Sequence, residues 1–154
     1  MPEESLTGRP VKLLRMLYEK STPISTYTLR IKQNELASQL GISRQALNVH
    51  LRKLRDQGYI RTGRGFIDIT EKGLTFLGIS ANPAFVFLKI SPFQRREAYE
   101  RIFQFPILRI FRVAGDMDAI LVIERGKLDE ALKMLANIDG VVDTRSYIAI
   151  QTLK

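Results

Sequence analysis

Hydrophobic residues in the first half of the chain recur at helical spacing in three places. They predict helices over residues 10–20, 33–40 and 44–57. After the second of these, Gly41 favours the left-handed conformation that ends a helix, and Ser43 is placed to cap the helix that follows. We therefore expect the second and third helices to meet at a tight corner.

Short alternating runs of β-forming residues predict strands around these helices. One is expected over 26–31, and two more, over 59–62 and 66–70, flank a glycine-rich turn at 63–65. A closing helix is expected over 71–77. A helical corner followed directly by a hairpin is typical of a winged helix-turn-helix.

The second half of the chain changes its hydrophobic period repeatedly, in the order β-α-β-β-α-β. The six segments are 84–90, 94–105, 108–113, 119–124, 127–137 and 143–152. This order is typical of a ferredoxin-like fold, in which two helices cover one face of a four-stranded antiparallel sheet. The other face carries aromatic and aliphatic residues, so we expect a second copy of the chain to cover it.

Together these patterns predict an α+β protein in two units. We expect a tail over residues 1–8, a winged helix-turn-helix domain over 9–78, a linker over 79–83 and a ferredoxin-like βαββαβ domain over 84–154.

The net charge of the chain indicates what kind of partner it binds. The net charge is +8, and residues 1–80 hold 13 Lys and Arg against 7 Asp and Glu, which leaves +6 in the first half. An excess of this size indicates a polyanion such as DNA, although it also suits a protein that is basic only for solubility.

Several function classes are excluded by what the sequence lacks. Without cysteine there is no disulfide, thiolate metal site or cysteine nucleophile, and His50 has no second histidine to join it in a metal site. We expect His50 to pack in the interior. No apolar run approaches the roughly 18 residues that span a bilayer, and the start of the chain is acidic where a secretion signal is basic. The expectation is a cytoplasmic protein with no membrane contact, no cofactor, no metal and no catalytic site.

The predicted third helix has one side for the protein and one side for a ligand. Leu51 and Leu54 lie within about 40° of Leu47 around the helix axis at 100° per residue, which indicates the buried side. The residues we expect to meet DNA lie at the start of this helix and on its other side: Ser43, Arg44, Gln45, Asn48, Val49 and Arg52.

The types of these side chains suit base recognition in a major groove. Gln and Asn can form paired hydrogen bonds with adenine, and Arg can do so with guanine. Val49 can rest on a thymine methyl group, although a helix with only a structural role would also tolerate it. Ser43 can cap the helix and also bind a phosphate. Arg61 and Arg64 bracket the wing and are expected to contact the DNA backbone or the minor groove.

Two family resemblances follow from particular stretches of sequence. Residues 29–78, with Leu-Gly-Ile-Ser-Arg-Gln-Ala-Leu, Leu-Arg-Lys-Leu and Gly-Tyr-Ile, resemble the winged helix of the Crp/Fnr group. Val49 stands where that group often has a base-reading arginine, so the DNA site of that group is not carried over. Residues 84–153, with Phe-Arg-Val-Ala-Gly-Asp-Met-Asp-Ala-Ile-Leu-Val and then Gly-Val-Val-Asp-Thr, resemble the effector domain of Lrp/AsnC regulators.

The Lrp/AsnC resemblance implies a homodimer formed through the second-half sheets, assembly of dimers into larger homo-oligomers, and an amino-acid-like effector near Gly115. Asp116 and Asp118 could bind the ammonium group of such an effector. The alternative is a polar hairpin turn in which both carboxylates are solvated or organise the backbone.

The function predicted from the sequence is a dimeric, sequence-specific transcriptional regulator that binds double-stranded DNA. One alternative is an architectural, chromatin-like protein that binds DNA by charge alone. The other is an enzyme that uses the α+β unit, but that unit lacks cysteine, histidine and a phosphate-binding Gly-Lys-Ser/Thr loop.

Overall fold

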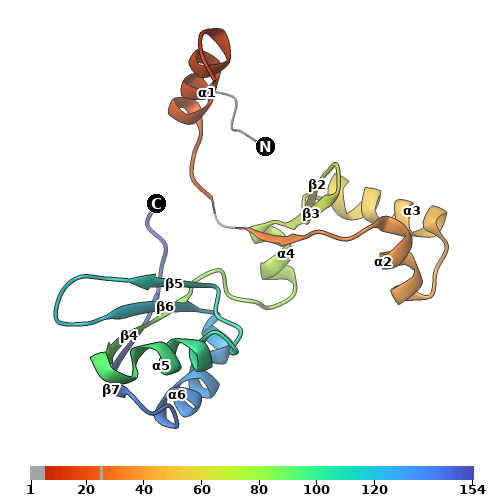
Figure 1. The fold of residues 1–154 in the computed structure, drawn as a ribbon. Coiled ribbons are helices and arrows are strands. Elements are labelled where there is room, and N and C mark those ends of the chain that lie inside the picture. The colour runs from red at the N-terminus through yellow and green to blue at the C-terminus, as the bar shows by residue number, and fades with distance from the viewer. Residues whose placement is uncertain (1–5, 25) are drawn as a thin grey trace.

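The computed structural model describes residues 6–24 and 26–154 and contains the predicted elements in the predicted order (Figure 1). The expected tail lies partly outside these residues. In the first half the elements are α1 (Arg9–Lys20), β1 (Tyr27–Leu29), α2 (Gln33–Leu40), α3 (Arg44–Asp56), β2 (Ile60–Gly63), β3 (Phe66–Ile69) and α4 (Glu71–Phe76). We call residues 9–76 the reader.

The three strands of the reader form one antiparallel sheet in the order β1-β3-β2. β1 joins the hairpin from the side of β3, where Tyr27 pairs with Ile69. The helix α4 begins after Thr70, whose hydroxyl accepts a hydrogen bond from the Gly73 amide and donates one to the Gly58 carbonyl. The cap at Thr70 therefore both starts α4 and ties it to the loop after α3.

The second half contains β4 (Ala84–Ile90), α5 (Arg95–Ile102), β5 (Arg109–Arg112), β6 (Ala119–Ile123), α6 (Leu128–Ala136) and β7 (Val141–Ile148), with a 3-10 turn before each helix. All neighbouring strands are antiparallel, in the order β5-β6-β4-β7. Two β-α-β units with this strand order form the ferredoxin-like arrangement, so the predicted fold class is confirmed.

The main hydrophobic core lies between this sheet and its two helices. Alternate residues of β4 and β6 point into it, among them Val86, Leu88 and Leu121, all with 0% exposure. They meet Ile102 of α5 and Leu135 of α6. One face of the sheet is thus fully covered by helices (Figure 1).

No helix within residues 6–24 and 26–154 covers the opposite face of the sheet. Its central residues, such as Phe85, Phe87 and Val122, are half-buried, whereas Phe111 and Tyr147 toward the edges are 40% and 56% exposed. The rings of Phe87 and Tyr147 meet edge to face at 5.5 Å. The aromatic and aliphatic face predicted from the sequence is therefore present and open.

The end of β6 and the start of β1 come close in space. Burial raises the pKa of the Tyr27 phenol, and the nearby carboxylate of Glu124 raises it further, so the phenol stays uncharged. The segment 77–83 between α4 and β4 contains neither helix nor strand. None of the helices in the described part of the chain has the length and apolar composition needed to cross a bilayer.

A close backbone approach at Gly73 predicts a measurable cost for adding one methyl group. A Cβ atom there would lie 2.4 Å from the Tyr59 carbonyl oxygen. We expect Gly73→Ala to lower the free energy of unfolding by about 1–3 kcal/mol, because α4 must move off the hairpin. Gly126→Ala is the control, since its new methyl group would meet nothing within 4 Å. Denaturant unfolding measures both, and equal stabilities would contradict the close approach.

Candidate nucleic-acid interface

The corner between α2 and α3 is built as the sequence predicts. Gly41 adopts the left-handed conformation with φ 65°, and its amide donates to the carbonyls at the end of α2. Ile42 then donates to the Ala37 carbonyl at 3.0 Å. The Ser43 hydroxyl accepts from the Ala46 amide at 3.1 Å and so caps α3. These bonds define the direction in which α3 leaves the corner.

The two sides of α3 have the predicted environments only in part. Leu47 is 2% exposed, and Leu51 is half-buried, so this side packs against the reader. Leu54 lies on the same side but is 39% exposed. The interior position predicted for His50 is wrong for a single chain, because its side chain is exposed at the edge of the leucine stripe.

All the helix residues predicted to meet DNA lie on the accessible surface of one short segment. Val49 is 62% exposed and lies between the polar side chains around it. The others, also exposed, are Ser43, Arg44, Gln45, Asn48 and Arg52. The structure therefore brings these six positions together on the start and outer side of α3.

The wing ends in a tight turn that carries Arg64. Gly63 pairs with Phe66 across the hairpin, which leaves Arg64 and Gly65 at the tip, and Gly65 has φ 82°. The Phe66 ring lies where a side chain on Gly63 would stand, only 2.2 Å from its Cβ position. Arg64 is exposed at the end of this rigid loop.

Arg61, the other predicted wing residue, is partly engaged within the protein. Its guanidinium lies 3.8 Å from the Asp68 carboxylate, which also accepts a hydrogen bond from the Thr28 hydroxyl at 2.6 Å. The Arg61 side chain remains 52% exposed. It can contact a phosphate only while sharing its charge with Asp68.

Sequence reasoning did not find that Arg55 connects α3 to the wing. Its guanidinium donates to the Thr62 hydroxyl at 3.4 Å and lies 4.0 Å from Asp56. Periodicity alone assigns Arg55 to a solvated run of charge, and no sequence signal pairs it with a residue in the following strand. This contact holds the wing beside the helix.

Positive charge on this surface is largely uncompensated. Among the side chains that the structure describes, Arg44, Arg52 and Arg64 take part in no salt bridge. The acidic groups nearby, Asp56 and Asp68, each already have an arginine partner. Such a surface attracts a phosphate backbone.

The carboxylates of the predicted effector loop have different surroundings. Asp118 accepts a hydrogen bond from the Ile90 amide at 2.7 Å and lies 3.3 Å from the Arg95 guanidinium. Asp116 is exposed, and Gly115 beside it is exposed as well. Asp118 thus organises the backbone, as in the alternative considered from the sequence, whereas Asp116 is available to a ligand.

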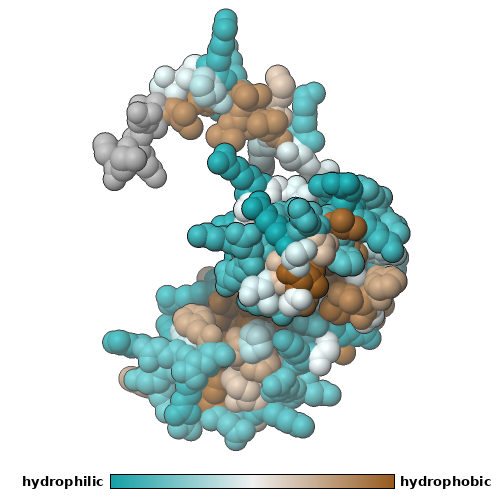
Figure 2. Space-filling view, turned by 90° about the vertical axis from the view of Figure 1, so that its right-hand side faces the viewer, coloured by the Kyte–Doolittle hydropathy of each residue, from teal (hydrophilic) through white to brown (hydrophobic). Residues whose placement is uncertain are grey.

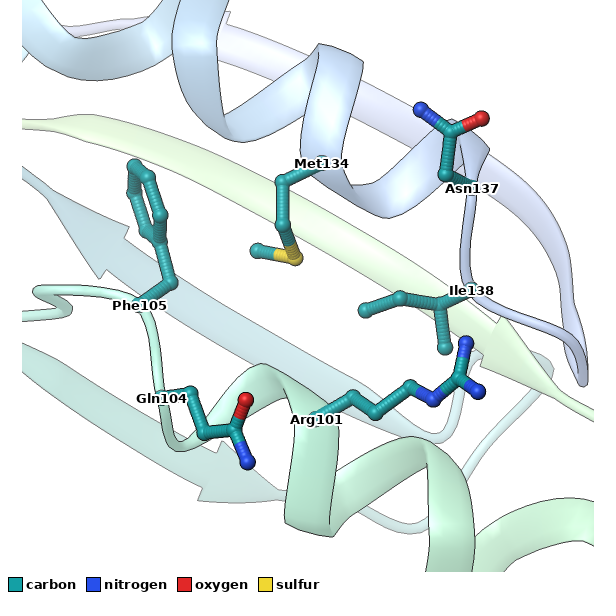
Figure 3. A pocket seen from close by; sticks show the side chains of 6 residues that line it. All are labelled: Arg101, Gln104, Phe105, Met134, Asn137 and Ile138. Carbon is teal, nitrogen blue, oxygen red and sulfur yellow. The ribbon is translucent and has the colours of Figure 1, made fainter.

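A shallow hollow of about 420 Å³ lies between α5 and α6, away from that loop (Figure 3). Figure 3 shows Met134 and Ile138 on one side of it and Arg101, Gln104 and Phe105 on the other. It contains no acidic group. Within residues 6–24 and 26–154, no three acidic or histidine side chains are grouped in a way that could hold a metal ion.

The chain is similar to known helix-turn-helix regulators. The Crp-like helix-turn-helix domain family matches residues 9–73. The HTH-type transcriptional regulator FL11 of Pyrococcus horikoshii is 25% identical over 124 residues, which cover 78% of this chain and 78% of FL11. An uncharacterised protein of Methanocaldococcus jannaschii is 51% identical over 45 residues, or 29% of this chain and 17% of that protein.

Solved structures of regulators are also similar over nearly the whole chain. An AsnC family transcriptional regulator from Agrobacterium tumefaciens has 23% identity and a TM-score of 0.47, covering 96% of this chain and 93% of its own. A transcriptional regulator from Neisseria meningitidis, solved in complex with L-Met, has 19% identity and a TM-score of 0.48, covering 97% and 93%.

The family match agrees with the Crp/Fnr resemblance noted in the sequence. The family match lies within the reader, and the similarity to FL11 extends across both halves. Residues 9–73 thus match the Crp-like helix-turn-helix domain family, and the chain as a whole is similar to the transcriptional regulator FL11.

Proposed function

We propose that this protein is a homodimeric, sequence-specific DNA-binding transcriptional regulator that inserts α3 into the major groove. The observation that carries the proposal is the exposed set of polar side chains on α3, opposite the buried Leu47. An α-helix fits the major groove, where each base pair presents a distinct pattern of donors and acceptors.

Within this set the roles follow from side-chain chemistry. Gln45 and Asn48 are placed to bind adenine, and Arg44 and Arg52 to bind guanine. Val49 rests on a thymine methyl group, which is the one base feature that an apolar side chain can select.

Contacts to the DNA backbone come from the ends of the surface. The Ser43 hydroxyl keeps its cap hydrogen bond and lies beside the helix N-terminus, where phosphates bind favourably. Arg64 extends from the wing tip, and Arg61 adds a weaker contact because Asp68 shares its charge. These contacts orient the reader without selecting a sequence.

A two-fold dimer explains how one short helix can specify a long site. The open sheet face, with Phe87, Phe111 and Tyr147, offers an apolar surface that a second copy can cover isologously. Two readers related by this axis require an inverted-repeat site with half-sites about 34 Å apart, one turn of DNA. We infer a functional division into a DNA-binding domain over 9–78, a linker over 79–83 and an assembly domain over 84–154. Larger assemblies of these dimers would need a second interface, because the two-fold pairing is closed.

A small-molecule effector with an ammonium group would bind at the Gly115 loop. Asp116 is exposed there, and an amino acid offers the matching positive charge. Asp118 shapes the same loop through its bonds to Ile90 and Arg95. In this proposal, Asp116 binds the effector, and Asp118 holds the loop that carries Asp116.

Replacing the base-reading side chains should abolish sequence preference. We expect Gln45→Ala/Asn48→Ala/Arg52→Ala to lose at least about 100-fold in preference for the selected site, since each paired base contact contributes about 1–3 kcal/mol. The site is first selected from a random pool of duplexes, and affinities for it and for a scrambled duplex are then compared at physiological salt.

Lys53→Ala is the matched control for that triple variant, because it removes one positive charge from the same helix. Its affinity should fall equally for both duplexes, so that preference is kept. A triple variant that keeps its preference would refute readout by α3. A wild-type protein with no preference would indicate binding by charge alone.

Replacing Arg64 should weaken binding to every sequence by the same factor. A lost phosphate contact reduces the slope of log affinity against log salt concentration by about 1. We therefore expect Arg64→Ala to show this smaller slope on both specific and scrambled DNA, measured by titration at several salt concentrations. Arg96→Ala is the control: it removes an exposed arginine on the surface of α5, and it should leave the salt dependence of DNA binding unchanged. A change in preference between the duplexes would instead place Arg64 on a base.

The two loop carboxylates should separate into one stability residue and one ligand residue. Asp118→Ala is expected to lower the free energy of unfolding by about 1–3 kcal/mol, because the buried Ile90 amide loses its acceptor. Asp116→Ala should change it by less than about 0.5 kcal/mol but reduce any thermal shift caused by free amino acids. If no amino acid shifts the melting temperature of the wild type, the effector proposal fails while the DNA proposal stands.

A further inference from the structure

The first helix of the reader has no buried residue in the chain that carries it. Leu14 and Leu17 of α1 are 59% and 55% exposed, and Tyr18 beside them is 82% exposed. Figure 1 shows α1 apart from the rest of the reader, and Figure 2 shows hydrophobic side chains gathered on it. A helix of 12 residues is marginal in water unless packing covers its apolar side. The helix therefore needs a partner surface.

Four residues of α1 form one continuous apolar stripe, whereas Leu13 and Met16 lie outside it. At 100° per residue, Val11, Leu14, Leu17 and Tyr18 lie within about 60° of Leu14. Lys12 and Glu19 lie on the other side of the helix. This arrangement is that of a helix packed along its length against a protein.

The rest of the reader exposes a surface that matches α1 in kind. Leu54 lies about 20° from the buried Leu47 around α3, yet it is 39% exposed, and Leu40 at the end of α2 is 60% exposed. His50 is exposed at the edge of the same stripe. Among its described residues the reader buries only four apolar side chains, Ala37, Leu47, Ile60 and Leu74, against thirteen in the cluster of the second half.

The dimensions of the two surfaces agree. At 1.5 Å per residue, α1 is about 18 Å long and α3 about 20 Å long. Leu47 is already buried and Leu51 is half-buried, so α1 would add its cover mainly at Leu54, toward the end of α3. The rest of the reader, residues 26–76, thus has an apolar side that is partly uncovered, and α1 has an apolar side without a partner.

The segment after α1 directs it away from its own chain. Residues 21–24 contain no helix or strand, and Pro23 within them cannot continue the helix. When a short hinge segment holds an element away from its own chain, an identical surface on a second copy can take it at little cost, because the contacts are the same.

We propose that α1 of one copy packs in trans on α2 and α3 of a second copy, so that each DNA reader is complete only in the dimer. The occupant is a second copy because the vacant surface and the displaced helix belong to the same sequence. The proposal needs a second copy but not the DNA selectivity proposed above.

Cross-linking between copies tests the swap without DNA, because the chain has no cysteine of its own. Leu14→Cys on one copy and Leu54→Cys on another, differently tagged, are co-expressed as full chains and oxidised mildly. A disulfide requires Cα atoms within about 7 Å, so a trans packing joins the two tags. We expect this product to exceed that of a Lys12→Cys and Leu54→Cys pair by about tenfold, because Lys12 lies on the polar side of α1.

Three results would overturn the swap. A double variant, Leu14→Cys/Leu54→Cys, that closes within one chain while the co-expressed pair gives no mixed product would show that α1 folds back on its own reader. Cross-linking of Leu14→Cys chains with each other would show that two α1 helices pair directly. No cross-link in any combination would show that α1 binds another surface.

A second pair guards against a variant that fails to fold. Leu17→Cys with Leu40→Cys probes the end of α2 in the same way, and circular dichroism confirms helical content for each variant. Loss of DNA selectivity with an intact cross-link would count against the proposed function and leave the swap standing. Loss of the cross-link with intact DNA selectivity would count against the swap alone.

Discussion

The proposed DNA-binding surface depends on which side of α3 is buried. Only one side of a helix can pack against the body of the protein, and Leu47, at 2% exposure, determines that side. The Ser43 cap and the left-handed Gly41 determine where the helix begins and in which direction it runs. Gln45, Asn48 and Arg52 face outward as a consequence. The hydrophobic contact of Leu47 thus determines which side chains of α3 face the solvent.

That contact is weak compared with the core of the second half. Full burial of a leucine contributes about 1.5–3 kcal/mol, so a stripe in which Leu54 stays 39% exposed forfeits part of its stabilisation. The sheet of the second half buries Val86, Leu88 and Leu121 completely. The second half can therefore fold as a stable base for dimerisation, while the reader is the part whose stability needs a further contact.

Most of the fold could be predicted from the sequence because its signals are local. The cap bonds of Gly41, Ser43 and Thr70 reach no more than four residues along the chain, and hydrophobic periodicity indicates the order of the elements. The ends were less accurate: β7 begins at Val141, two residues before the predicted start, because Val141 pairs with Ile90.

Features that depend on distant residues could not be predicted in the same way. The bond from Ile90 to Asp118 spans 28 residues, and the one from Arg55 to Thr62 joins a helix to a strand, so neither leaves a periodic signal. The helical pattern places His50 at the edge of the apolar stripe of α3. It does not show that this edge is left exposed within a single chain. A helical pattern identifies an apolar side and says nothing about which chain supplies the partner.

A first helix supplied by the partner would connect assembly with DNA recognition. In a chain on its own, α3 would rest on an incomplete support, and ordering it on DNA would cost part of the binding energy. In a swapped dimer, each α3 is supported before DNA arrives, and the two readers are held by the sheets and by the exchanged helices. A regulator built in this way gains affinity when it dimerises, even though no residue at the sheet interface touches DNA.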